Sequence, residues 1–282
     1  MIQTLTLGVD WEKAGLPGPK TEAELKIMLL PNTDDISEWA ERPLILITPG
    51  GAYAYCSNRE AEPIAAKFLA AGFHTAILRY SVAPDHFPTA ALELAWSLQY
   101  IRSHAKEWHI RPDAIGTCGF SAGGHLACTV GTLWEDRLFE KTLGAGAGWR
   151  PDFQILGYPV ISMGEFTHAF SRECLLGKPE EEGNQLFRQE ELSLETRVGP
   201  HVPPTFLWHT LADESVPVEN SLMYAAALRK AGAPFEMHIY ERGEHGLATC
   251  EPITARGSAQ VVPDNAGWID HAIRFVHRRI EA

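Results

Sequence analysis

The pentapeptide Gly119–Gly123 has the pattern G-x-S-x-G and constrains the fold more than any other part of the chain. The short apolar run 113–118 before it is typical of a buried strand, and the apolar residues 124–130 after it are typical of a buried helix. A strand that passes directly into a helix makes a sharp turn, and glycines in this turn leave room for the neighbouring backbone. The turn would hold the hydroxyl of Ser121 clear of the chain, which favours a reactive serine over an ordinary Gly/Ser turn.

Apolar segments on either side of this turn alternate between strand-like and helix-like patterns. The run 44–47 is apolar without alternation, as expected for a strand covered on both faces. We therefore predict an α/β fold, a mainly parallel sheet with helices on both faces and a small insertion over its carboxyl edge. Strands are expected at 24–30, 44–48, 73–79, 113–118, 153–156, 205–210 and 235–240, and helices at 58–71, 88–108, 124–133, 218–231 and 264–279.

The length of 282 residues, of which 45% are hydrophobic and 21% charged, suits one large domain. We expect a single domain over residues 1–282. The glycine-rich stretch 134–150 is expected to be irregular. From about 162 to 201 the chain becomes polar and acidic between two expected strands, which indicates a cap-like insertion rather than a second domain.

Charge and cysteine content exclude several classes of protein. The chain has 24 Lys and Arg against 36 Asp and Glu, a net charge of −12, so neither nucleic acid nor an anionic membrane is an expected partner. Its five cysteines are scattered without C-x-x-C spacing, which argues against a disulfide framework or a structural zinc site. Residues 1–7 lack the features of a signal peptide, and no apolar run could span a membrane, so we predict a cytoplasmic location.

A serine hydroxyl needs a base to become nucleophilic, and the base needs an acidic group to orient it. Asp213 follows the expected strand 205–210, and His245 follows the expected strand 235–240. The carboxyl ends of parallel strands meet at one edge of the sheet, where Ser121 is also expected. We predict His245 as the base and Asp213 as its partner, with the adjacent Glu214 as a rival. His209 and His125 are interpreted as packed histidines.

Negative charge that develops on a carbonyl oxygen needs backbone N–H donors. We predict that Ala122, directly after Ser121, supplies one donor. The turn after strand 44–48 contains two glycines, and we predict that Gly51 and Ala52 supply the others. Tyr53 and Phe120 stand beside these donors and are predicted to bind substrate in a small acyl pocket. No metal ion or organic cofactor is implied.

Several stretches together resemble the acetyl esterase branch of the α/β-hydrolases, which includes acetyl xylan esterases. They are residues 49–53, 57–60, 78–84, 119–127, 208–210 and 213–218. The resemblance extends from about residue 44 to the end of the chain. Pro49 and Ala52 depart from the H-G-G-G loop of related esterases, where His and a third Gly are usual. The resemblance implies an α/β-hydrolase fold, a serine triad and short-acyl ester substrates.

The resulting hypothesis is a serine carboxylesterase acting on acetyl-type esters, with acetylated sugars or xylan fragments as candidate substrates. Two alternatives stay open: a serine peptidase-like hydrolase on the same fold, and a non-catalytic scaffold that binds a ligand. A dienelactone-type hydrolase would carry Cys where this chain has Ser121. The expected partner is a small ester, and formation of a homo-oligomer is left open.

Overall fold

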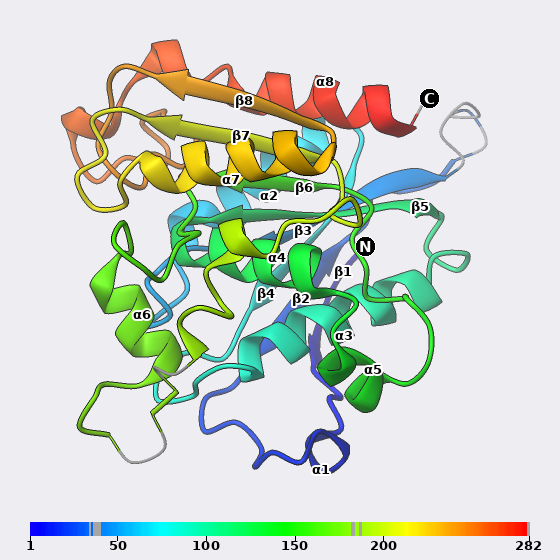
Figure 1. Cartoon of the computed structure of the whole chain (residues 1–282). Coiled ribbons are helices and arrows are strands. Elements are labelled where there is room, and N and C mark those ends of the chain that lie inside the picture. The colour runs from blue at the N-terminus through cyan, green and yellow to red at the C-terminus, as the bar shows by residue number, and fades with distance from the viewer. Residues whose placement is uncertain (34, 36–40, 182–183, 186–187, 281–282) are drawn as a thin grey trace.

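The computed structural model describes residues 1–33, 35, 41–181, 184–185 and 188–280. Its centre is an eight-stranded sheet in the order β1-β2-β4-β3-β5-β6-β7-β8, with helices on both faces (Figure 1). Strands from β4 to β8 along this order pair in parallel, whereas β1 and β2 add an antiparallel edge. The predicted α/β fold with a mainly parallel sheet is confirmed.

The main strands and helices occur in the predicted order along the chain. The strands are β1 (Ile2–Thr6), β2 (Glu24–Met28), β3 (Arg42–Thr48), β4 (His74–Arg79), β5 (Ile110–Phe120), β6 (Gln154–Gly157), β7 (Thr205–Thr210) and β8 (Phe235–Tyr240). The helices are α1 (Trp11–Ala14), α2 (Glu62–Ala70), α3 (Thr89–Ser103), α4 (Ser121–Leu133), α5 (Arg137–Leu143), α6 (Ala169–Leu176), α7 (Glu219–Ala231) and α8 (Trp268–Ile280). Short 3₁₀ turns include Asn58–Glu60, which precedes α2.

Three elements differ from the prediction. The expected helix 88–108 ends at Ser103 and continues as turns. The stretch 134–150, expected to be irregular, contains α5, because the side chain of Asp136 caps the helix by accepting from the N–H of Leu138. Strand β1 was not predicted, since it is half exposed and depends on pairing with β2.

Strand β3 explains why an apolar run without alternation marks a central strand. All of Leu44 to Ile47 are fully buried. Because successive side chains point to opposite faces, Leu44 and Leu46 pack into one hydrophobic core and Ile45 and Ile47 into the other. The two cores lie on the two faces of the sheet; the first includes residues of α3 and α4, and the second residues of α2 and α8.

The expected insertion 162–201 contains α6 and the 3₁₀ turn Leu194–Thr196. Helix α6 lies beside the carboxyl ends of the strands, toward which the arrows of Figure 1 point. Residues 182–183 and 186–187 of this insertion, like 34 and 36–40 of the link before β3, lie outside the described residues. Within the described part of the chain, no helix is long and apolar enough to cross a membrane.

Candidate active site

The turn that carries Ser121 has no residue between strand and helix. Strand β5 ends at Phe120 and α4 begins at Ser121, whose φ is +54°. A Cβ at Gly119 would lie 2.3 Å from the carbonyl oxygen of Gly123, and a Cβ at Gly123 would lie 2.1 Å from that of Thr48. The two glycines are therefore required by close backbone approach, and the strained serine sits where the sharp turn exposes its hydroxyl.

Ser121, His245 and Asp213 lie in one hydrogen-bonded chain. The Nε2 atom of His245 is 2.8 Å from the Oγ of Ser121, and its Nδ1 atom is 2.6 Å from the Oδ2 of Asp213. The three residues follow β5, β8 and β7 and so meet at the carboxyl edge of the sheet. A nucleophile, a base and an orienting carboxylate require this order of contacts.

Asp213 is held as a carboxylate from several sides. Its side chain is fully buried, Oδ1 accepts the N–H groups of Ser215 and Val216, and Oδ2 is 3.3 Å from Nε2 of His209. Burial raises the pKa of Asp213, but the contacts with His209 and His245 and the Val216 N–H outweigh it and keep the pKa well below its usual value. The rival Glu214 is exposed, and among the described residues no hydrogen bond or ion pair joins it to His245.

His209 and His125 are buried and hydrogen-bonded, as packed histidines are. His209 contacts the hydroxyl of Ser221 and the carbonyl of Val216 as well as Asp213. It therefore helps to hold the carboxylate of Asp213 in contact with His245. The sequence did not indicate this role, because His209 lies within a strand.

The loop after β3 faces Ser121 with strained backbone. Gly51 has a φ of +133° and Ala52 a φ of +57°, and both line the same cavity as Ser121 and His245. Across the described residues, no protein group accepts a hydrogen bond from the N–H of Gly51 or Ala52. Ala122 lies in the first turn of α4, where N–H groups have no acceptor within the helix. These positions suit the three predicted donors to an oxyanion.

Replacement of Gly51 by alanine tests this loop. A Cβ at Gly51 would lie 1.9 Å from the carbonyl oxygen of Tyr55, so the loop must shift and move its donors. For the ester hydrolysis predicted from the sequence, we expect kcat to fall by about 10²–10³-fold, the loss typical of one misplaced oxyanion donor. Gly257→Ala is the matched control, because a Cβ there meets nothing within 4 Å. Equal rates for the two variants would contradict the role of the loop.

A buried pair, Glu60 and Tyr158, connects this loop to His245 and was missed in the sequence. Glu60 accepts the N–H of Gly50 at 2.9 Å and the hydroxyl of Tyr158 at 2.6 Å. The ring of Tyr158 packs edge-on against that of His245, with 5.1 Å between their centroids. Tyr158 directly follows β6, so its place at the carboxyl edge was the available signal. Glu60 lies in the stretch 57–60 that carries the family resemblance, but the stretch gave no indication of the contacts that Glu60 makes.

A cavity of about 270 Å³ opens over Ser121. Besides the site residues, its wall includes Tyr55, Arg59, His168, Phe170, Arg256 and Gln260. His168 and Phe170 come from the expected insertion. The cavity therefore forms between the sheet edge, the insertion and the segment before α8.

Tyr53 and Phe120, expected to bind substrate, lie outside the wall of this cavity. Tyr53 is buried, with its hydroxyl 2.9 Å from Nδ1 of His125. Phe120 is fully buried against Tyr158 and Trp268, because strand alternation turns it into the core on the α2 and α8 face. The structure thus corrects this expectation: both side chains pack in the hydrophobic cores next to the site and do not line the cavity.

The parallel sheet and the strand–serine–helix turn, with a histidine and an acid on later loops, define the class of the α/β-hydrolases. Residues 35–228 match the model of the BD-FAE family, and the chain belongs to this family. The resemblance to acetyl esterases is confirmed by relatives with such names.

Two curated relatives are similar to most of this chain. An endo-1,4-beta-xylanase B from Butyrivibrio fibrisolvens is 35% identical over 77% of the chain, and an acetylxylan esterase from Xylanibacter ruminicola is 32% identical over 72%. The aligned part spans only 33% and 40% of these longer proteins. The crystal structure of an acetyl ester-xyloside bifunctional hydrolase from Caldicellulosiruptor lactoaceticus is 33% identical, with a TM-score of 0.81, over 98% of this chain and 96% of that one.

Proposed function

We propose that this chain is a serine carboxylesterase that hydrolyses short-acyl esters, acetyl esters in particular. The observation that carries the proposal is the chain of contacts from Ser121 through His245 to Asp213, beside unpaired N–H groups of the loop after β3. Relatives named as esterases support the same reaction class.

The geometry supports a two-step reaction. Ser121 Oγ attacks the ester carbonyl while His245 Nε2 takes its proton, and the N–H groups of Gly51, Ala52 and Ala122 stabilise the oxyanion. His245 then gives that proton to the leaving alcohol, which leaves an acyl group on Ser121. Water attacks this acyl group, His245 takes its proton and returns it to Ser121, and the carboxylic acid departs. Asp213 holds the required tautomer of His245 and stabilises its cationic form.

The size of the cavity supports a short acyl group. A volume of about 270 Å³ must hold both the acyl group and part of the alcohol, and small-molecule sites commonly start near 300 Å³. We propose that segment 162–201 caps the site within a single domain, because His168 and Phe170 contribute to the wall. The named activities of the acetylxylan esterase and the acetyl ester-xyloside hydrolase make acetylated sugars or xylan fragments the favoured substrates.

Hydrolysis of p-nitrophenyl acetate, butyrate and octanoate tests the proposed acyl preference. We expect kcat/KM to be highest for the acetate and to fall at the octanoate, because a cavity that must also hold part of the alcohol leaves little room for a long acyl chain. A preference for octanoate would overturn the acyl assignment while leaving the serine mechanism intact. Acetylated xylo-oligosaccharides are the next substrates to assay.

The two alternatives predict different reactivities. A peptidase-like hydrolase would cleave peptide anilides at rates comparable to esters. A non-catalytic scaffold would hydrolyse no ester and would leave Ser121 unlabelled by a fluorophosphonate probe. A cytoplasmic location and the absence of nucleic acid or membrane partners stay predictions from the sequence.

A further inference from the structure

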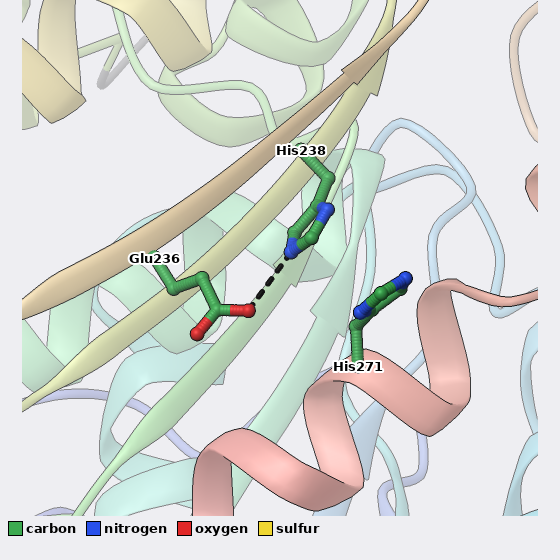
Figure 2. A group of neighbouring side chains, drawn as sticks. All are labelled: Glu236, His238 and His271. Atoms are coloured by element: carbon green, nitrogen blue, oxygen red, sulfur yellow. Dashed lines mark hydrogen bonds and ion pairs between the residues drawn. The ribbon is translucent and has the colours of Figure 1, made fainter.

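Three potential metal ligands gather where β8 meets α8. Glu236 and His238 lie on β8 and His271 lies on α8, and each offers a ligand atom within 4.8 Å of the others (Figure 2). In the part of the chain that the structure describes, no other group of His, Cys, Asp or Glu meets this criterion. We propose that this group binds one divalent transition-metal ion, with Zn²⁺ as the best match.

Packing of the helix on the sheet brings the ligands together. Glu236 and His238 are two residues apart on a strand and so project from the same face. Helix α8 covers that face: Trp268 stacks on Trp208 with 4.9 Å between ring centroids, and Phe275 packs on Phe206 at 5.9 Å.

His271 lies between these two anchors, three residues after Trp268 and four before Phe275, and therefore on the same side of the helix. Its ring stacks on that of His238 at 4.4 Å. Core packing thus sets the position of His271, and the group does not depend on a mobile surface side chain.

A hydrogen bond joins Glu236 and His238 at the position that the metal ion would take. Nε2 of His238 lies 2.9 Å from Oε1 of Glu236, so a metal ion can replace the shared proton between them. The other oxygen, Oε2, is paired with Arg278 and can keep this partner while Oε1 binds the metal. Hydrogen-bonded carboxylate ligands of this kind are usual around metal ions.

His271 must exchange one partner. Its Nδ1 accepts from the guanidinium of Arg274 at 3.0 Å, so this nitrogen carries no proton and has its lone pair available. Arg274 is exposed and can turn into solvent when a metal ion takes its place. The guanidinium groups of Arg274 and Arg278 repel a bound cation. Replacement of Arg274 by a neutral residue should therefore strengthen metal binding, which gives the proposal a test with a predicted direction.

The donor set selects the class of metal. Two imidazoles and one carboxylate suit Zn²⁺ and related ions such as Co²⁺, whereas Mg²⁺ and Ca²⁺ prefer oxygen ligands alone. Tetrahedral zinc with metal–nitrogen distances of about 2.0 Å places its ligand atoms roughly 3.3 Å apart. The ligand atoms of the three side chains lie up to 4.8 Å apart, so the longest distance between them must shorten by roughly 1.5 Å when zinc binds. A water molecule would be the fourth ligand. The bound ion would tie α8 to the edge strand, which is a structural role.

Zinc titration by calorimetry of the EDTA-treated full chain tests this site, with Co²⁺ absorption as a second readout. We expect one Zn²⁺ per chain, a higher melting temperature with zinc, and a tetrahedral Co²⁺ spectrum. His238→Gln and His271→Gln should each weaken binding by about tenfold or more. Arg274→Gln should tighten it, because a competing cation is removed. His86→Gln is the matched control, since His86 is paired with the single carboxylate Glu181.

Several results would overturn the proposal. Absence of zinc binding in the intact chain would do so, and so would unchanged affinity in folded His238→Gln and His271→Gln variants. If zinc bound at His245 instead, the two substitutions would leave its affinity unchanged and zinc would inhibit ester hydrolysis. That result would also contradict a site at Glu236, His238 and His271. Weaker binding in Arg274→Gln would contradict the assigned ligand atom of His271. The ester assay reports on the proposed function separately, because the two sites share no residue.

Discussion

Ser121→Ala is expected to lower kcat for p-nitrophenyl acetate by about 10⁴-fold or more, the loss that triad knockouts produce. Alanine removes the oxygen that would form the acyl-enzyme and leaves His245 with no proton to accept. The donors of the loop after β3 and the cavity stay in place, so residual hydrolysis above the rate in water is expected.

Measurement of kcat and KM in parallel with fluorophosphonate labelling checks this result. The variant should lose the label, and KM should change far less than kcat, because the substitution removes one hydroxyl and leaves the other residues of the cavity wall in place. Ser258→Ala serves as the control, since Ser258 is exposed and lies outside the cavity. Retention of rates within a few-fold of the intact chain would rule out Ser121 as the nucleophile.

Asp213→Asn is expected to lower kcat by about 10⁴-fold, through the tautomer of His245. Oδ1 of Asp213 accepts the N–H groups of Ser215 and Val216, so the amide oxygen of asparagine must take that place. Its NH₂ group then faces Nδ1 of His245, where the carboxylate oxygen stands at 2.6 Å. Nδ1 becomes an acceptor, the proton moves to Nε2, and Nε2 can no longer take the proton of Ser121.

Glu214→Gln separates the two acidic candidates of this loop. Glu214 is exposed, and its replacement should leave kcat within a few-fold of the original value. Circular dichroism should show both variants folded, because asparagine preserves the two backbone contacts of the loop. A large loss in Glu214→Gln together with an active Asp213→Asn would reverse the assignment.

The parallel strands were predictable because their signal is local. Strands β7 and β8 have the bounds expected from their sequence patterns, and β3 was recognised because it is buried on both faces. Strand β1 depends instead on pairing with β2, which lies some twenty residues away along the chain. A five-residue segment with half its side chains in solvent carries no strong pattern of its own.

The contacts among Ser121, His245 and Asp213 were predictable for a related reason. Chain order and the rule that parallel strands end at one edge place Ser121, Asp213 and His245 together without any knowledge of side-chain contacts. The direction of individual side chains follows no such rule. Tyr53 and Phe120 stand beside the donors in sequence, yet strand alternation and loop twist turn both into the cores.

The sequence by itself therefore determined the order of the main strands and helices, the sharp turn at Ser121 and the meeting of Ser121, Asp213 and His245 at one edge of the sheet, because each rests on local periodicity or chain order. Only the tertiary structure decided which groups surround them. Glu60 meets Tyr158, and Glu236 and His238 meet His271, because helices and loops distant in sequence pack on particular faces of the sheet. Such contacts depend on the packing of whole elements, and no spacing within the sequence specifies them.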